Sequence, residues 1–291
     1  MQFGVHFSLG VGFNPTADDY ARVVQKIEEL GFHSAWVADH IVIPEKIEAP
    51  YPWTDDGSPG FPRRAPFPDV FALLGYLAAK TKKIHLGTSV LVLPQRNPIE
   101  VAKAVATVDM LSGGRFLFGV GVGWLKDEFD VLGEIFSERG PRTREYVKIM
   151  KALWQGGPVG FEGKFFQFPP VYALPTPVQK PHPPIIFGGE SLAAMKRVAE
   201  LGDGWQPGVM PLETLREKLD QLKRLTAERG RDYSQLSLAT FGSPDVVKQR
   251  PDSVVQLSAL GISQMVLGFM GKNAQDTIAQ LEDFARAAMK A

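Results

Sequence analysis

Two neighbouring residues, Asp39 and His40, combine a carboxylate with an imidazole at the point where an apolar segment ends. Residues 34–38 are typical of a buried strand, so the pair would lie where the chain leaves that strand. Imidazole is the side chain most readily used as a general acid or base near neutral pH, and a preceding carboxylate can orient it or hydrogen-bond a cofactor. The pair could instead cap a loop. Its position ahead of a long proline-rich loop favours a catalytic role.

A glycine-rich segment follows a second apolar run. Residues 115–120 are apolar except for the first, and glycine recurs at Gly119, Gly121 and Gly123. Such a run is typical of a strand buried on both faces, as in a parallel sheet wrapped by helices. Glycine removes side chains where a flat ligand or another backbone must come close. Relief of crowding inside a barrel would explain the same glycines.

A third cluster, Gly188, Gly189, Glu190 and Ser191, leads straight into a predicted helix. Exposed backbone N–H groups, the helix dipole and a serine hydroxyl together favour an anion, and phosphate is the natural guest. An ordinary serine N-cap would explain Ser191 but not the two glycines before it. We therefore expect a phosphate-binding turn at this position.

Two further segments contribute to the predicted pocket. In the first strand, residues 3–9, His6 and Ser8 alternate with bulky apolar residues and would face the interior of a barrel. Residues 41–67 form a long connection interrupted by prolines, and a loop of this length is usually functional. We expect it to cover the pocket. Its aromatic residues indicate an apolar or aromatic substrate, and they are Tyr51, Trp53, Phe61 and Phe67.

Composition limits the classes of function. Lys plus Arg equals Asp plus Glu, at 32 each, so there is no basic field for nucleic acid. The absence of cysteine removes disulfides, thiolate metal sites and a cysteine nucleophile. His33 and His85 begin strands at the opposite face and His182 lies in a linker, so we expect no metal site. We also expect no membrane span and no secretory leader, and hence a cytoplasmic protein.

The elements that would position these residues alternate along the chain. Strands are predicted at residues 3–9, 34–38, 84–90, 115–120, 185–187, 203–206, 236–241 and 265–269. Helices are predicted at residues 16–30, 68–80, 98–110, 142–155, 191–201, 212–229, 251–260 and from 273 to the C-terminus. A β-hairpin at residues 159–168 and a proline-rich linker at 169–184 interrupt the alternation, so residues 157–184 form an insertion.

Eight strands, each followed by a helix, predict an α/β fold with a single (β/α)8 TIM barrel domain over residues 1–291. A doubly wound open sheet is the alternative. It would place its glycine-rich phosphate site at the first βα turn, whereas glycine clusters here after strands four and five. Active sites of barrels lie at the carboxyl ends of the strands, which would bring the three clusters together with Thr88 and Ser89.

The chain resembles the bacterial luciferase-like oxidoreductases, and within them the branch that uses the deazaflavin coenzyme F420. Four motifs carry the resemblance in order along essentially the whole chain: LGTSVLVLPQRNP, LSGGRFLFGVGVGW, PPIIFGG and GDGWQP. The resemblance implies a barrel with a hairpin insertion and a flavin-type ring lying across the strand ends. It also implies that His40 lies close to the reacting ring face and that Ser89–Val90 is a cis peptide in a bulge behind the ring.

The strand ends and the long loop, together with the resemblance, assign residues to the cofactor and the substrate. The expected cofactor-binding residues are Asp39, Thr88, Ser89, Val90, Gly119, Gly121, Gly123, Gly188, Gly189 and Ser191. The expected substrate-pocket residues are His6, Ser8, Trp53, Trp124 and Trp205. Residues 123–127 stand where some sugar-phosphate dehydrogenases of this branch carry a glutamate and an asparagine, which argues against that substrate.

The sequence therefore predicts an oxidoreductase that moves hydride between coenzyme F420 and a small organic substrate, with His40 and Asp39 as catalytic residues. An FMN-dependent monooxygenase supplied by a separate flavin reductase is the alternative on the same fold. A non-redox barrel such as a lyase or isomerase would need a strand-end lysine or metal ligands, and neither is visible. A homodimer is expected from the family alone.

Overall fold

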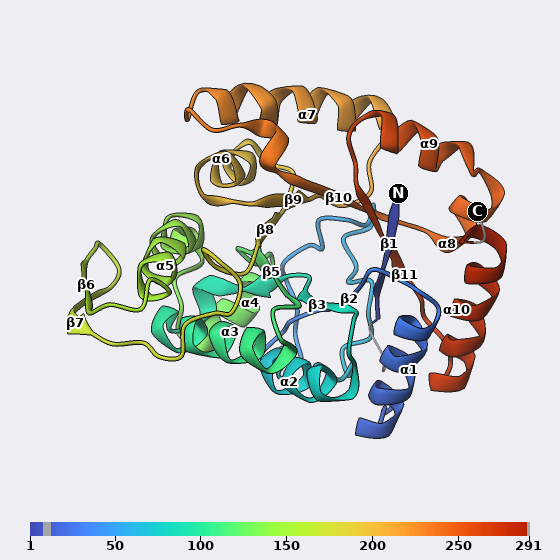
Figure 1. The fold of residues 1–291 in the computed structure, drawn as a ribbon, viewed down its shortest axis with the longest axis horizontal. Helices are drawn as coiled ribbons and strands as arrows, with labels where there is room; N and C mark the ends of the chain where they lie inside the picture. Colours follow the sequence, from blue (N-terminus) through green and yellow to red (C-terminus); the bar gives the residue numbers. More distant parts are fainter. Residues whose placement is uncertain (8–12, 290–291) are drawn as a thin grey trace.

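The computed structural model describes residues 1–7 and 13–289. Within these residues eight strand positions run parallel, and the sheet closes because β11 pairs with β1 and β3 pairs with β5 (Figure 1). The barrel strands are β1 (Gln2–His6), β2 (Ser34–Val37), β3 (His85–Thr88), β5 (Phe116–Gly121), β8 (Ile185–Gly188), β9 (Gly204–Gln206), β10 (Ser237–Gly242) and β11 (Gln264–Gly268). The predicted (β/α)8 barrel is confirmed.

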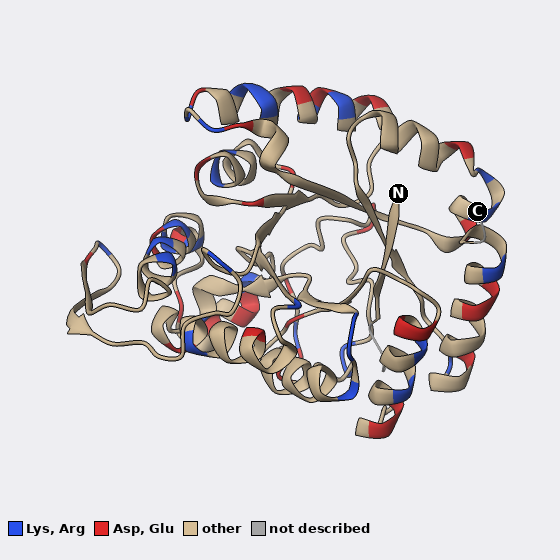
Figure 2. Ribbon diagram, in the orientation of Figure 1, with Lys and Arg blue, Asp and Glu red and all other residues tan. Residues whose placement is uncertain are grey.

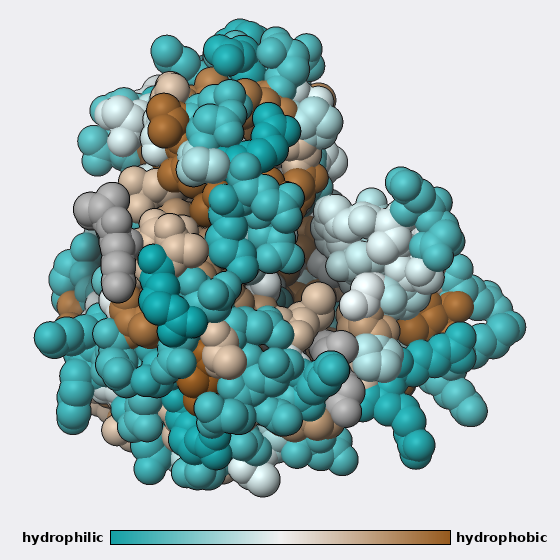
Figure 3. All heavy atoms as spheres, turned by 90° about the vertical axis from the view of Figure 1, so that its right-hand side faces the viewer, coloured by the Kyte–Doolittle hydropathy of each residue, from teal (hydrophilic) through white to brown (hydrophobic). Residues whose placement is uncertain are grey.

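Helices follow the strands around the outside of the barrel (Figure 1). The longer ones are α1 (Ala17–Glu29), α2 (Val70–Lys80), α3 (Pro98–Ser112), α5 (Arg139–Leu153), α6 (Leu192–Leu201), α7 (Leu212–Ala227), α9 (Asp252–Ala259) and α10 (Ala274–Ala288). Figure 2 shows acidic and basic residues interspersed along outer helices such as α7 and α10. In Figure 3 hydrophilic residues cover most of the face shown.

Local side chains determine where these helices begin. Thr16 forms the predicted cap, because its hydroxyl accepts the Asp19 N–H and the Asp19 carboxylate accepts the Thr16 N–H. Asn273 caps α10 as predicted. The second helix differs from the prediction: Asp69 caps it by accepting the N–H of Ala72, so it begins at Val70 and not at residue 68.

Several short elements were not predicted from the sequence. They are α4 (Lys126–Leu132), α8 (Pro244–Gln249) and the 3₁₀ turns η1 (Leu93–Gln95), η2 (Phe136–Glu138) and η3 (Tyr233–Gln235). Two or fewer helical turns show little periodicity, so a sequence pattern cannot distinguish them from loop. Among them α4 proves to be important for the site.

The lower part of the barrel interior is filled by Trp36. Its neighbours Ala35 and Val37 pack into the core beneath the helices, so the indole points inward. The indole N–H donates to Ser34 Oγ at 2.7 Å, and Ile186 and Val266 pack against the ring. Glycine is required opposite it, because a Cβ at Gly87 would lie 2.4 Å from the indole. Trp36 therefore fills the space between these strands inside the barrel.

The third barrel strand is interrupted as the resemblance implied. β3 ends at Thr88, the Ser89–Val90 peptide is cis, and pairing resumes in β4 (Leu91–Val92). The prediction of a cis bond is confirmed. At this break Gly119 of β5 faces the Thr88 carbonyl, and a Cβ there would lie only 1.8 Å from that oxygen. Gly119 therefore makes room for a neighbouring strand, which is the crowding explanation of the glycine.

The predicted insertion is a two-stranded antiparallel hairpin, β6 (Val159–Glu162) and β7 (Gln167–Val171), that projects from the barrel beside α5 (Figure 1). Glu145 of α5 ties it down, because its carboxylate accepts the backbone N–H groups of residues 164–166. The following linker begins after Val171 and not after residue 168. The hairpin is on the outside of α5 and contributes no residue to the lining of the cavity described below.

Candidate active site

A cavity of about 1280 Å³ lies at the carboxyl ends of the barrel strands. All eight barrel strand ends contribute side chains or backbone to its lining, through His6, Asp39, His40, Ser89, Val90, Gly121, Gly188, Gln206, Phe241 and Gly268. The loop of residues 41–67 supplies much of the remaining wall, as predicted. The barrel therefore brings together residues that are more than two hundred positions apart in the chain.

His40 is held by Glu128 of α4, a residue that the sequence analysis did not single out. The Nδ1 atom of His40 lies 2.9 Å from Glu128 Oε2, and the Glu128 side chain is 1% exposed. Glu128 Oε1 also accepts the backbone N–H groups of Ile41 at 2.7 Å and Val42 at 3.2 Å. Burial by itself would raise the pKa of Glu128, but these hydrogen bonds and the proximity of His40 hold it below its ordinary value. An ionised carboxylate therefore orients the imidazole.

Asp39 has a different partner from the one expected. Its carboxylate binds the Arg96 guanidinium through two hydrogen bonds, at 2.8 and 2.9 Å, and also accepts the Val92 N–H at 2.9 Å. Burial raises the pKa of Asp39, and Arg96 offsets part of that rise. The prediction that Asp39 orients His40 is wrong, because the Nδ1 atom of His40 bonds to Glu128, whereas the Asp39 carboxylate bonds to Arg96 and Val92. The pair instead joins the end of β2 to the backbone after the strand-three break.

Aromatic rings surround His40. The ring centroids of Phe67 and Phe61 lie 4.9 and 5.4 Å from the imidazole centroid, and that of Trp124 lies 6.4 Å away. Tyr51 packs between Trp124 and Trp53, with centroid distances of 4.9 and 5.1 Å. Burial raises the pKa of the Tyr51 phenol, so this ring is neutral over the working range. All five aromatic residues line the cavity together with His40, so the imidazole is part of a mainly apolar wall.

The floor of the cavity is built from backbone and small residues. The Val90 side chain lies between Gly121 and Gly188, where a Cβ would come within 2.3 and 3.1 Å of its methyl groups. Two polar side chains at this level have no hydrogen-bond partner among the described residues: the hydroxyl of Ser89 and both amide atoms of Gln206. Buried polar atoms are normally paired, so an unpaired hydroxyl and amide beside a flat glycine-lined floor fit the polar edge of a flavin-type ring.

His6 lies beside the same floor. Its Nε2 is 3.3 Å from the Ser89 carbonyl, and its ring packs edge-on against Phe241 at 5.7 Å. Burial lowers the pKa of His6, so the neutral ring can donate its Nε2–H to that carbonyl. The predicted partner Ser8 falls outside the described residues.

The predicted phosphate turn also lines the cavity. Gly189 has φ +90°, a conformation that glycine adopts readily, and the Ser191 hydroxyl caps α6 by accepting the N–H of Ala194 at 3.2 Å. Glu190 accepts the N–H of Gly208 and does not face the helix end. Two arginines that the sequence analysis did not single out, Arg139 and Arg197, line this end of the cavity.

Three predicted site residues do not line the cavity. Trp205 is fully buried beneath the phosphate turn, where its indole N–H donates to the Gly189 carbonyl at 2.9 Å. Its assignment to the substrate pocket is wrong, because the ring supports the turn from behind. Thr88 and Gly119 bond to each other through the Thr88 hydroxyl and the Gly119 carbonyl at 2.7 Å. Both residues join neighbouring strands of the barrel wall, and neither would contact a cofactor ring in the cavity.

The other histidines lie away from this cavity. His33 and His85 stack at 4.6 Å where β2 and β3 begin, which agrees with the predicted opposite face. His182 was expected at the surface, but it is buried against Trp154, with ring centroids 5.6 Å apart. Residues 1–7 and 13–289 contain no group of three or more histidine, aspartate or glutamate side chains able to hold a metal ion.

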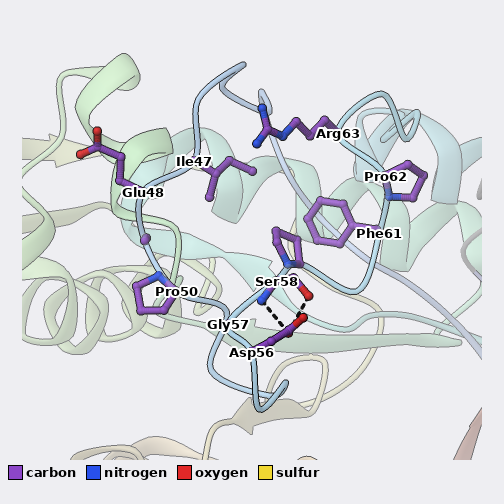
Figure 4. A pocket seen from close by; sticks show the side chains of 11 residues that line it. Ile47, Glu48, Pro50, Asp56, Gly57, Ser58, Phe61, Pro62 and Arg63 are labelled. Atoms are coloured by element: carbon purple, nitrogen blue, oxygen red, sulfur yellow. Dashed lines mark hydrogen bonds between the residues drawn. The ribbon is translucent and has the colours of Figure 1, made fainter.

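A smaller pocket of about 570 Å³ lies within the covering loop itself (Figure 4). Asp56 closes a tight turn there by accepting the N–H and hydroxyl of Ser58, and Arg63 reaches back to donate to the Glu45 carbonyl at 2.5 Å. These bonds stabilise the loop as a wall. The bond to Glu45 occupies the Nη1 atom of Arg63. Because the pocket lacks the strand-end residues, we assign the chemistry to the larger cavity.

Fold and site together define a class: a parallel eight-stranded barrel with a hairpin insertion, a break in the third strand and a histidine–glutamate pair over a flat cavity floor. The sequence model of the luciferase-like monooxygenase family matches residues 1–290. The chain belongs to this family.

Individual relatives span both cofactors of the family. An uncharacterised protein of Mycobacterium tuberculosis is 33% identical over 98% of each chain. An F420-dependent glucose-6-phosphate dehydrogenase of Amycolatopsis mediterranei is 33% identical over 68% of this chain and 56% of its own. An FMNH₂-dependent dimethylsulfone monooxygenase of Pseudomonas putida is 32% identical over 53% of this chain and 43% of its own.

Solved structures with the same fold include a monooxygenase and an F420-dependent dehydrogenase. A monooxygenase from Streptomyces bottropensis superposes with a TM-score of 0.81 at 21% identity, over 99% of both chains. An F420-dependent secondary alcohol dehydrogenase in complex with an F420–acetone adduct superposes with a TM-score of 0.77 at 22% identity, over 98% of this chain and 97% of the other. At these identities the likeness establishes the fold alone.

Within the described residues no helix is long and apolar enough to cross a membrane.

Proposed function

We propose that this chain is an oxidoreductase that binds coenzyme F420 across the strand ends and moves hydride between the coenzyme and a small apolar or aromatic substrate. The observation that carries the proposal is the His40–Glu128 pair, at 2.9 Å, set in a cavity whose floor is glycine-lined and carries unpaired polar atoms. The similarity to an F420-dependent dehydrogenase supports the choice of coenzyme.

The residues that would hold the ring are those of the cavity floor and the turn. Val90 with Gly121 and Gly188 would support its face, and Ser89 Oγ with the Gln206 amide would hydrogen-bond its polar edge. The bound coenzyme would supply the hydride donor or acceptor, which no side chain can provide. Binding and orienting the ring is therefore the first task of these residues.

The second task is proton transfer, which falls to His40. Because Nδ1 faces an ionised carboxylate, it carries the proton of that hydrogen bond and leaves Nε2 to take up or release another. Glu128 also stabilises the imidazolium that forms when His40 accepts a proton. The surrounding aromatic rings limit the access of water and strengthen this charge interaction.

The lining of the cavity near His40 favours the substrate class. Phe61, Phe67 and Trp124 contact the imidazole, and Tyr51 and Trp53 extend the same wall towards the opening. A ketone, alcohol, imine or enone with an apolar or aromatic body would bury its carbon skeleton there and present its polar atom to His40.

An FMN-dependent monooxygenase supplied by a separate flavin reductase is the second candidate. The similarity to an FMNH₂-dependent monooxygenase favours it, and the same floor would accept either ring. A homodimer, a separate reductase and a cytoplasmic location stay predictions, as does one domain over residues 1–291. We no longer favour a non-redox barrel, because the chain belongs to a family with redox relatives.

Titration of the pure protein with each cofactor tests the proposal. Oxidised F420 and FMN are both fluorescent, and burial of either ring beside Trp124 and Tyr51 is expected to change that fluorescence. Saturable binding of F420 at least tenfold tighter than that of FMN, about 1.4 kcal/mol, supports the first candidate. The reverse preference supports the second. No saturable binding of either cofactor contradicts both.

A further inference from the structure

Arg197 is a buried cation without a counter-ion among residues 1–7 and 13–289. It lies on α6 and is 6% exposed, yet it lines the cavity. Its Nε atom has no hydrogen-bond partner, and the structure shows no hydrogen bond or ion pair from its guanidinium to any residue in 1–7 and 13–289. Burial, with repulsion from Arg144 and Arg139, lowers the pKa of Arg197 to about 10, so it is still charged at neutral pH.

The acidic residues close to Arg197 in the sequence do not neutralise it. Glu190 accepts the Gly208 N–H at 2.6 Å, and Glu200 pairs with Arg144 at 2.7 Å and with Lys148 at 3.1 Å. A charge on a side chain as buried as Arg197, without an ionic partner, lowers the stability of a fold. A packing role alone would be served as well by an apolar side chain of similar size, so the charge indicates an anionic ligand.

The position of Arg197 indicates where that anion binds. Gly189, Ser191 and Ala194 at the N-terminus of α6 line the same cavity, and the positive end of this ten-residue helix favours an anion there. On the other side the guanidinium approaches the start of α5, since a Cβ built on Gly140 would lie 3.2 Å from Nη1 of Arg197. Arg197 therefore lies beside the start of α5 and shares the cavity lining with the start of α6.

Arg139 adds a second positive charge to this end of the cavity. Its Nε donates to the Gly123 carbonyl at 3.2 Å, and its guanidinium lies over the Phe136 ring at 3.7 Å from the centroid. These contacts anchor the side chain at the end of β5 and still leave it on the cavity lining. Helix end, Arg197 and Arg139 thus converge on one end of the cavity.

We propose that Arg197, assisted by Arg139, binds the phosphate ester of the cofactor and provides most of the selection for a phosphorylated cofactor over its phosphate-free form. This deepens the proposed function and rests on it. The sequence analysis assigned phosphate only to Gly188, Gly189 and Ser191, whose backbone groups supply partial charges. A buried guanidinium supplies a full charge and two directed donors, which makes a stronger and more selective phosphate contact.

The test compares cofactors with and without phosphate in the parent and in Arg197→Met. F420 is paired with its phosphate-free deazaflavin riboside, and FMN is paired with riboflavin. We expect Arg197→Met to weaken binding of the phosphorylated member by about tenfold or more and that of the phosphate-free member by less than about threefold. Arg144→Met is the matched control, because Arg144 is partly exposed, pairs with Glu200 and does not line the cavity. In each cofactor pair, Arg144→Met should leave the ratio between the affinities of the phosphorylated and the phosphate-free member unchanged.

A stability measurement separates this role from a structural one. Because Arg197→Met removes an unpaired buried charge, the free variant is expected to unfold at the same temperature as the parent or higher. Inorganic pyrophosphate should raise the unfolding temperature of the parent and not that of the variant. A variant that is clearly destabilised and keeps the parent's preference for phosphorylated cofactors would overturn the inference.

The failure of the inference and that of the proposed function can be told apart. If no deazaflavin or flavin binds the parent, the proposed function fails, and the pyrophosphate comparison alone decides whether Arg197 binds phosphate. If the cofactors bind but the phosphorylated and phosphate-free forms bind equally well, the proposed function stands and the inference is wrong.

Discussion

Replacing Glu128 by glutamine keeps the shape of the side chain and removes its charge beside His40. In the parent, Oε1 accepts the N–H groups of Ile41 and Val42, and Oε2 faces His40 Nδ1. A glutamine keeps both backbone bonds only if its carbonyl oxygen stays at the Oε1 position. Its amide NH₂ then faces Nδ1, which must become the acceptor. The neutral ring would carry its proton on Nε2, the reverse of the parent.

The expected loss follows from the one charged hydrogen bond that disappears. A hydrogen bond to a charged group contributes about 1.5–3 kcal/mol, so the step that places a positive charge on His40 slows by about 10- to 150-fold. Glu128→Asp keeps the charge but withdraws it by one methylene, and we expect an intermediate loss. Cofactor affinity should change little in both variants, since Glu128 does not line the cavity.

Stability gives a second readout with a defined pH dependence. The folded-state pKa of Glu128 lies below its ordinary value of 4.5, so the ionised form favours the folded state. That contribution is fully present above about pH 4.5 and is lost as the pH falls through the folded-state pKa. Glu128→Gln should therefore destabilise the protein to urea at neutral pH, and the difference from the parent should shrink in acid.

Three measurements check this reasoning. They are turnover across pH with the best substrate from a screen of ketones, alcohols, imines and enones, the nitrogen chemical shifts of isotope-labelled His40, and urea unfolding. Asp130→Asn is the control on the same helix, because the Asp130 side chain is exposed and pairs with Lys126. A Glu128→Gln variant with the parent's rate, pH profile and His40 tautomer would show that Glu128 does not orient the imidazole.

The remaining predictions concern the residues around this pair. His40→Ala should keep cofactor binding within a few-fold and reduce turnover by about 10²–10⁴, and equal rates across pH would move the proton-transfer role elsewhere. Asp39→Ala leaves Arg96 unpaired, so we expect a loss of about 3–5 kcal/mol in the free energy of urea unfolding, and a loss below about 1 kcal/mol would contradict the structural role. Gly189→Val should weaken cofactor binding at least tenfold, about 1.4 kcal/mol. Gly261→Val is its control, because Gly261 has a similar φ of +87° and no neighbour within 4 Å of a Cβ, and it should leave binding unchanged.

The site could be predicted from the sequence where it depends on strand ends and local turns. His40 comes shortly after β2, Gly188 ends β8 and Ser191 caps α6, so local pattern and barrel topology suffice to bring them to one edge. The break at Ser89 was predicted from a motif. Trp205 shows the limit of this reasoning, because a residue in a strand at the mouth can still point behind the wall.

The partners of these residues could not be predicted in the same way. His40 bonds to a carboxylate 88 positions away, and Asp39 bonds to a guanidinium 57 positions away. Because Asp39 is next to His40 in the chain, the sequence suggested that its carboxylate orients the imidazole. Successive residues at a strand end point in different directions, however, so Asp39 turns towards Arg96 whereas His40 turns towards α4.

The sequence by itself determined the barrel, the order of its strands and which residues lie at their carboxyl ends, because hydrophobic periodicity and turn chemistry act over a few residues. Only the tertiary structure decided that Glu128 orients His40, that Asp39 is neutralised by Arg96, and that Arg197 has no counter-ion within the part of the chain that the structure describes. The physical reason is that hydrogen bonding and the burial of charge depend on what surrounds a side chain in space. Those surroundings exist only once the sheet has closed and α4, α5 and α6 have packed around its ends.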